Sequence, residues 1–172
     1  MDKPEAARSF QFEVLKFDEP TFGSRYIFDM YTLQTAVNMY MQHINVDGSV
    51  AAHNRPQYLG QLGTRDGMAL RVDLMSHRVK KLIVEPRHRK LFVQIVTLNT
   101  PSGMILQEFI ETSFHSVRPG LVGIGALTPE IYGAETAHRV QQDYRLLGVD
   151  MLVNFDPIYR GPKPWSTIDA SQ

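Results

Sequence analysis

Apolar and polar residues alternate with a period of two through much of the middle of the chain. Residues 89–98 and 104–114 show this pattern most strongly, and residues 99–103 between them, Asn-Thr-Pro-Ser-Gly, have the composition of a hairpin loop. Alternation of this kind places successive side chains on opposite faces of a β-strand. Weaker or shorter segments of the same kind lie at residues 9–17, 68–75, 78–84 and 150–155. The pattern predicts a mainly antiparallel sheet.

Two segments outside these strands have the periodicity of a helix. Residues 29–44 carry apolar side chains three and four positions apart, which fall on one helical stripe. They are Met30, Leu33, Val37, Tyr40, Met41 and Ile44. The second segment begins after Thr128, a good N-cap residue, with Pro129 at the first helical position. Gly148 suits a left-handed helix end, so the sequence predicts a helix over 129–147.

The order of these segments predicts an α+β fold. Strands are grouped in the middle of the chain, with the two principal helices, about 29–44 and 129–147, before and after them. The length of 172 residues is typical of one domain. We therefore expect a polar N-terminal tail at 1–8, one domain at 9–158 and a proline-rich C-terminal tail at 159–172.

The usual catalytic and cofactor patterns fail for chemical reasons. The chain has no cysteine, which excludes disulfides, thiolate nucleophiles and cysteine-ligated metals, and its six histidines show no metal-ligand spacing. The glycines of residues 119–125 are followed by Ala126 and Leu127, where a phosphate loop requires lysine and a hydroxyl residue. Glu108 and Glu111 fall on opposite faces of one predicted strand, so they do not pair for acid–base work. We expect no metal, no cofactor and no enzymatic activity.

Charge is distributed unevenly along the chain, although the formal net charge is zero. Residues 77–90 contain six lysines and arginines against one acid, Glu85, a net charge of +5 that the rest of the chain balances. A concentrated positive charge attracts phosphate-rich or acidic partners. The candidate binding residues are Arg78, Lys80, Lys81, Arg87, His88, Arg89 and Lys90.

Several partners are compatible with this basic segment. A charged strand edge that only prevents sheet-to-sheet aggregation is the simplest reading. The others are nucleic acid, an anionic membrane surface and an acidic protein, including another copy of the chain, whose residues 130–156 are locally acidic. Trp165, the only tryptophan, lies in the proline-rich tail. It is a candidate subunit contact, with folding back onto its own domain as the alternative.

These observations predict a non-enzymatic binding or assembly protein. Residues 77–90 would engage nucleic acid or a neighbouring subunit, within a homo-oligomeric assembly. The alternative is a small-molecule enzyme or ligand-binding domain with a pocket under the loop at 47–67, because long loops in compact domains often act as lids. No stretch approaches the length of about 18 apolar residues that a membrane span requires. Residues 1–9 lack the apolar core of a secretory signal, so we expect a cytoplasmic location.

Overall fold

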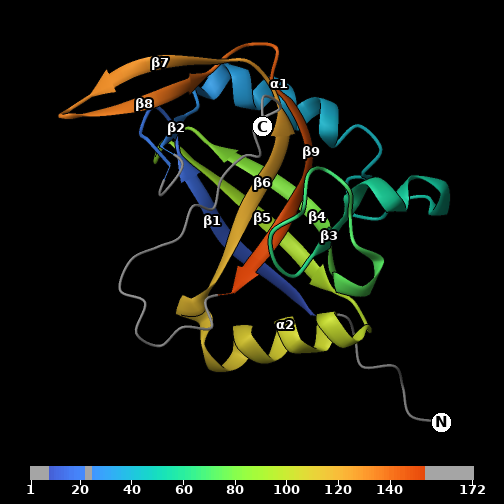
Figure 1. Cartoon of the computed structure of the whole chain (residues 1–172). Coiled ribbons are helices and arrows are strands. Elements are labelled where there is room, and N and C mark those ends of the chain that lie inside the picture. Colours follow the sequence, from blue (N-terminus) through green and yellow to red (C-terminus); the bar gives the residue numbers. More distant parts are fainter. Residues whose placement is uncertain (1–7, 22–24, 154–172) are drawn as a thin grey trace, which may run out of the picture.

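The computed structural model describes residues 8–21 and 25–153. Their central feature is a β-barrel that is open along one side (Figure 1). The barrel strands are β1 (Ser9–Lys16), β3 (Leu59–Gln61), β4 (Met75–Glu85), β5 (Lys90–Thr97), β6 (Val117–Ile124) and β9 (Arg145–Val153). Four of them form an antiparallel sheet in the order β1, β5, β4, β3. β6 and β9 pair antiparallel, and a parallel bridge between Leu62 and Met151 joins β9 to the end of β3. β1 and β6 are therefore the strands on either side of the opening.

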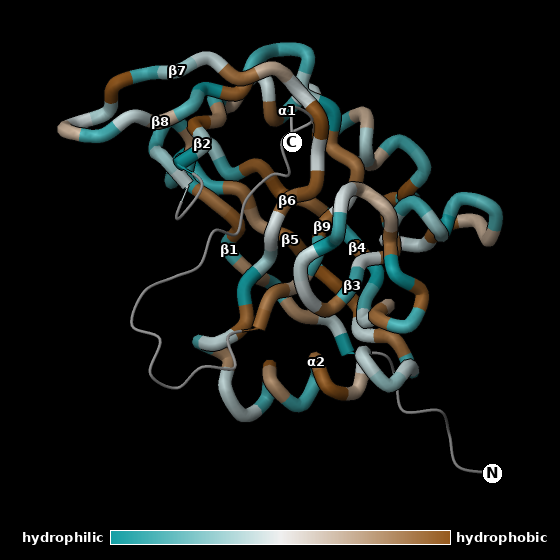
Figure 2. Tube along the Cα trace, viewed as in Figure 1, coloured by the Kyte–Doolittle hydropathy of each residue, from teal (hydrophilic) through white to brown (hydrophobic). Residues whose placement is uncertain are grey.

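The barrel interior is the hydrophobic core. Every second residue of β5 is buried, as a strand with one face toward a core requires. Three of these residues, Leu91, Val93 and Ile95, have no exposed surface. Figure 2 shows the hydrophobic residues concentrated along the central strands, with hydrophilic residues common in the loops around them. Burial of apolar surface, worth roughly 25 cal/mol per Å², stabilises the closed part of the barrel.

Two α-helices lie at opposite ends of the barrel, α1 (Met30–Tyr40) and α2 (Pro101–Thr112) (Figure 1). Short 3₁₀ turns cover residues Ala52–Tyr58, Val72–Leu74 and Phe114–Ser116. α2 begins in close contact with the sheet, since a Cβ added at Gly103 would lie 3.0 Å from the Ser76 carbonyl oxygen of β4 and 2.0 Å from that of Leu98, just after β5. Within the described part of the chain, neither helix has the length and apolar character of a membrane span.

A smaller sheet projects from the barrel beside α1 (Figure 1). It has the order β2, β8, β7, with β2 at Tyr26–Ile27, β7 at Leu127–Tyr132 and β8 at Glu135–Val140. β7 is an edge strand, and Pro129 stands opposite His138. The His138 amide donates to the Arg25 carbonyl, so the backbone of this pair points away from the space between β7 and β8. Pro129 therefore presents a position without an N–H to the free edge, where no ladder bond is lost.

The mixed α+β class with an antiparallel sheet and two principal helices is confirmed. The helix expected at 29–44 is α1, and the strands expected at 9–17, 78–84 and 89–98 are β1, β4 and β5. The strand expected at 150–155 is the end of β9 as far as Val153, where the description stops. The division into one domain with tails at 1–8 and 159–172 stays a prediction, because both tails lie almost entirely outside the described residues.

The prediction of a helix over 129–147 is wrong. These residues form the rest of β7, all of β8 and the start of β9. The reversal between β7 and β8 contains Gly133 at φ +65°, a conformation that glycine adopts without strain. The helical appearance comes from Ala137 and Val140, which are both buried although they lie three residues apart in a strand. The supposed cap, Thr128, pairs with Arg139 across the hairpin.

The second principal helix is α2, where the sequence predicted a hairpin loop and a strand. Its N-cap is Thr100, whose hydroxyl oxygen accepts a hydrogen bond of 3.0 Å from the Gly103 amide. Pro101 occupies the first helical position. Threonine, proline and glycine in this order suit a helix start as well as a turn. The prediction of a hairpin loop over 99–103 is therefore wrong, because these residues begin a helix.

The prediction of a strand over 104–114 is wrong, because part of the apolar pattern in this segment comes from residues that are exposed on a helix. Leu106 and Ile110 are buried four positions apart, as on one face of a helix. Met104 and Ile105 are apolar but exposed. The strand predicted over 68–75 is also wrong, since Val72–Leu74 form a 3₁₀ turn and strand β4 begins at Met75.

The N-cap of α1 gives a stability prediction. Asp29 Oδ1 accepts a hydrogen bond of 2.8 Å from the Thr32 amide, and Oδ2 accepts one of 2.9 Å from the Thr32 hydroxyl. Asp29→Ala is expected to lower the free energy of unfolding by about 1 kcal/mol, because it leaves the amide without its cap. Urea denaturation measures the change. Asp29→Ser, which keeps a capping oxygen, should recover most of it, and equal losses in both variants would contradict the explanation.

Candidate functional site

The predicted basic segment is divided by the structure into two parts. The part in the β4–β5 turn is paired with acids: Lys90 contacts Glu13 at 3.0 Å, and Arg89 contacts Asp18. His88 Nδ1 lies 2.9 Å from a carboxylate oxygen of Glu85. Hydrogen bonds from the turn to this carboxylate lower the pKa of Glu85 below its usual value. Local neutralisation therefore lowers the net positive charge of the turn.

Arg87 also lies in the β4–β5 turn, and the other basic residues, Arg78, Lys80 and Lys81, lie on β4. Arg78 donates a hydrogen bond of 3.0 Å to the Gly48 carbonyl, and its pKa is lowered by partial burial and by the neighbouring Arg55. A register shift between Val79 and Lys81 marks a bulge at Lys80, which lines a cavity of about 520 Å³ together with Lys81. Residues 44–48 form the other side of this cavity. The role of the seven candidate residues in binding an anionic partner stays a prediction. Trp165 lies outside the described residues.

The opening of the barrel leaves the outer edge of β1 without a hydrogen-bonded strand, although β1 and β6 approach within 8 Å (Cα–Cα) at several positions, so the edge is accessible where the two strands diverge. Phe10 and Phe12 stand opposite Ile95 and Val93 in hydrogen-bonded pairs, as shown by the bond of the next pair, from the Thr97 amide to the Arg8 carbonyl. The residues between them point their backbone groups away from β5. They are Ser9, Gln11 and Glu13 before the bulge of β1 and Lys16 after it. Among the described residues, these outward amides and carbonyls have no backbone partner.

β6 presents a less complete edge to the same opening. The Met151 carbonyl accepts from the Gly63 amide, so the backbone of Met151 faces β3, and Pro119 opposite it faces the opening. Proline offers no N–H there, and the Val117 amide already donates to the Phe114 carbonyl. On the same side, Leu121 has a backbone amide available as a donor. The two edges thus differ in what they offer to a ligand.

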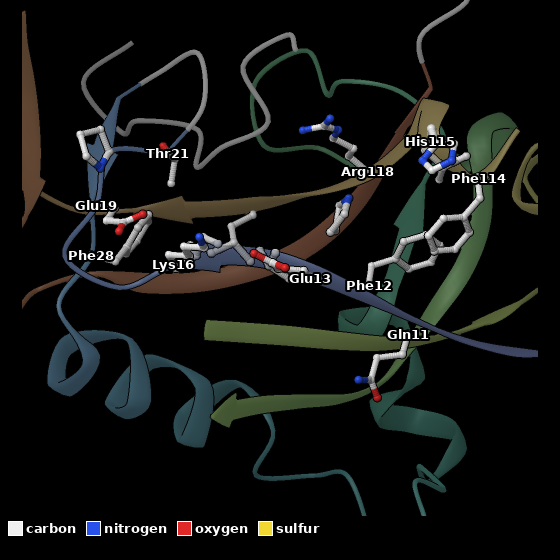
Figure 3. A pocket seen from close by; sticks show the side chains of 16 residues that line it. Gln11, Phe12, Glu13, Lys16, Glu19, Thr21, Phe28, Phe114, His115 and Arg118 are labelled. Atoms are coloured by element: carbon white, nitrogen blue, oxygen red, sulfur yellow. The ribbon is translucent and has the colours of Figure 1, made fainter. Parts of the chain in front are cut away.

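A groove of about 710 Å³ follows the opening between β1 and β6. Its size is within the range of ordinary ligand sites, roughly 300–1,000 Å³. At one end, the rings of Phe12 and Phe114 are stacked with centroids 5.1 Å apart and an angle of 10° between planes. Figure 3 shows Glu13 and Lys16 along β1 in the middle and Phe28 at the other end. The groove therefore combines an apolar floor with a charged rim.

The groove was not predicted from the sequence. One signal pointed to it: Pro119 lies inside a segment that is otherwise suited to a strand, Val-Arg-Pro-Gly-Leu-Val-Gly-Ile. A proline in a strand favours an edge position, and an edge strand borders an opening. Residues 119–125 resemble a phosphate loop only in their glycines, and the edge position of Pro119 was not predicted.

The groove and the barrel interior differ in the catalytic groups they contain. Among the described lining residues of the groove, the only hydroxyl is that of Thr21 and the only imidazole that of His115, and they lie toward opposite ends (Figure 3). Inside the barrel, the Ser76 hydroxyl lies 2.8 Å from His77 Nδ1, but both residues have no exposed surface. A substrate in the groove therefore meets no hydroxyl–imidazole pair among these residues.

His77 is held as a neutral imidazole. Nε2 lies 2.7 Å from the Val149 carbonyl oxygen, which only accepts, so Nε2 carries the hydrogen and Nδ1 accepts from the Ser76 hydroxyl. Burial lowers the pKa of His77 to about 4. The backbone is packed tightly against the ring, since a Cβ added at Gly60 would lie 2.2 Å from Nε2. His77 therefore connects β3, β4 and β9.

A buried ion pair fixes the segment after β3 onto β9. Arg65 Nε and Nη2 donate to the two carboxylate oxygens of Asp150 at 2.8 and 2.9 Å, and both side chains are almost fully buried. The Gln61 amide donates to the same carboxylate at 3.2 Å. Burial raises the pKa of Asp150, and its bonds with Arg65 oppose this rise. No group of three or more potential metal-binding side chains is found in the described ranges.

Comparison with known proteins identifies the fold. No family model matches the chain, and no curated protein sequence matches it. Among solved structures, the chain resembles the bacteriophage T4 capsid assembly protease, gp21, with a TM-score of 0.63 and 16% sequence identity. The likeness covers 86% of this chain and 83% of the protease.

This likeness corrects two predictions about function. The prediction of a non-enzymatic protein that binds an anionic partner is wrong, because the chain shares its fold with a protease, which is an enzyme. The expectation of no enzymatic activity is contradicted by the same finding, and nucleic-acid binding receives no support from it. The described part of this chain has the fold of a capsid assembly protease.

Proposed function

We propose that this protein acts on polypeptide chains during the assembly of a protein shell. The observation that carries the proposal is the open barrel: a fold shared with a capsid assembly protease has a groove of about 710 Å³ along its opening. A protease must hold a polypeptide substrate, and a groove between two strand edges can hold an extended segment. The proposal includes two expectations from the sequence, an assembly role within an oligomer and a cytoplasmic location.

A second observation supports polypeptide rather than a small molecule as the ligand. The groove follows β1 from Gln11 to Lys16, a length of roughly 17 Å at the usual rise per residue of a strand. Its ends differ in character, with stacked aromatic rings at one end and the segment from Glu19 to Thr21 at the other. An elongated site of this kind fits several consecutive residues of an extended chain.

The test uses a peptide library prepared from a digested proteome. The purified protein is incubated with the library, and mass spectrometry records which peptides are retained and which are cut. We expect a reproducible subset to be retained or cut, with common features at neighbouring positions. A heat-denatured sample of the same protein is the control. The absence of any peptide retained or cut above that control would overturn the proposal.

A further inference from the structure

We infer that the groove binds its polypeptide as an added β-strand that pairs with β1. This inference rests on the proposed function and specifies how the same groove recognises its ligand. Strand addition is a general mode of peptide recognition, in which main-chain hydrogen bonds give affinity and alternate side chains give specificity.

The free edge of β1 supplies the hydrogen bonds. Its outward residues Gln11, Glu13 and Lys16 each offer an amide donor and a carbonyl acceptor. β6 lacks a donor at Pro119, and the amide of Val117 is already bonded. The added strand therefore pairs with β1, and β6 acts as an apolar wall through Val117, Pro119 and Leu121, which are all buried.

The direction of the strand follows from the geometry of the two edges. β1 and β6 both point toward the α1 end of the barrel, although they are steeply inclined to one another (Figure 1). A strand that is antiparallel to β1 is then antiparallel to β6 as well. Antiparallel pairing is slightly more stable per residue than parallel pairing. The ligand therefore runs from the end of the groove near Lys16 toward the end near Phe12.

The side-chain pattern follows from the two faces of β1. Phe12 and Leu15 are buried and face the core, whereas Gln11, Glu13 and Lys16 lie on the outer side. Neighbouring strands share a face at opposite positions, so the ligand carries apolar residues at every second position. Glu13 is already paired with Lys90, whereas the ion pairs among the described residues do not include Lys16. An acidic ligand residue opposite Lys16 is therefore favoured.

The test compares two variants at one position. Gln11→Pro removes the outward amide, and Gln11→Ala removes the same side chain but keeps the amide. A displayed library of random twelve-residue peptides is selected on the wild-type protein, and the enriched peptides are measured on both variants. We expect alternating apolar and polar sequences, a loss of affinity of at least about tenfold for Gln11→Pro, and a clearly smaller loss for Gln11→Ala.

Melting temperatures and amide exchange distinguish a loss of strand pairing from a loss of folding. Both variants lose the hydrogen bond that Gln94 Nε2 donates to the Gln11 side chain, and they should melt at the same temperature as each other, since the amide that proline removes bonds to no described residue. If Gln11→Pro unfolds, amide exchange by NMR replaces it: a bound peptide should slow exchange at Gln11 and Glu13 in the wild type. Protection elsewhere, or equal binding by both variants, overturns strand addition while the proposed function stands. A library with no enriched peptide at all overturns both.

Discussion

Replacing Arg65 with alanine is expected to lower the free energy of unfolding by about 3–5 kcal/mol, the usual cost of leaving one charge of a buried pair without its partner. Asp150 keeps the Gln61 amide as a donor but loses both guanidinium bonds, at 2.8 and 2.9 Å. The carboxylate must then be ionised in the interior or take up a proton, and each state costs stability. Urea denaturation at neutral pH measures the loss.

The control for this prediction is the apolar pair Arg65→Met with Asp150→Leu. Replacement of a buried ion pair by apolar residues of similar size is often neutral or stabilising. We expect the double variant to recover most of the stability that Arg65→Ala loses. A loss under about 1 kcal/mol in Arg65→Ala would show that solvent reaches the pair, contrary to its burial.

Lowering the pH is expected to destabilise the protein through His77. Its pKa is about 4 in the folded protein, against 6.5 for an ordinary histidine, so the unfolded chain binds the proton more readily. Stability from this residue is complete above pH 6.5 and is lost as the pH falls from 6.5 to about 4. The slope is about 1.4 kcal/mol per pH unit, and the total is about 3 kcal/mol.

The measurement is a set of urea denaturation curves between pH 4 and 7.5. His77→Gln removes the titrating group, so the variant should lose stability less steeply over this range than the wild type. His53→Gln, at an exposed position, is the matched control and should keep the wild-type slope. Parallel curves for the wild type and His77→Gln would mean that His77 does not remain neutral in the folded protein.

The strands of the barrel and those of the smaller sheet differ in how well the sequence predicts them. β5 buries every second residue, so its period of two is visible in the sequence. In β8, burial does not alternate regularly, and the two buried residues, Ala137 and Val140, lie three residues apart. Local patterns report the environment of side chains, and that environment is set by neighbouring strands distant in sequence. The sheet with regular burial was therefore predicted, and the β7–β8 hairpin was not.

The groove illustrates a second limit of the sequence. Its recognition groups are backbone amides and carbonyls of β1, and every residue except proline carries both. Their availability depends on which strand lies beside β1, a property of the whole topology. The basic segment, in contrast, is obvious in the sequence, but pairing with Glu13, Asp18 and Glu85 reduces its effective charge. Composition made the segment conspicuous and gave no sign of the groove.

The opening between β1 and β6 has a thermodynamic consequence. A ligand that binds only the folded barrel raises the free energy of unfolding in proportion to the logarithm of its concentration, by about 2.7 kcal/mol at one hundred times its dissociation constant. A strand placed against Gln11 and Glu13 adds bonds that hold the edge of the sheet. The melting temperature of the protein is then expected to rise with the concentration of its polypeptide ligand.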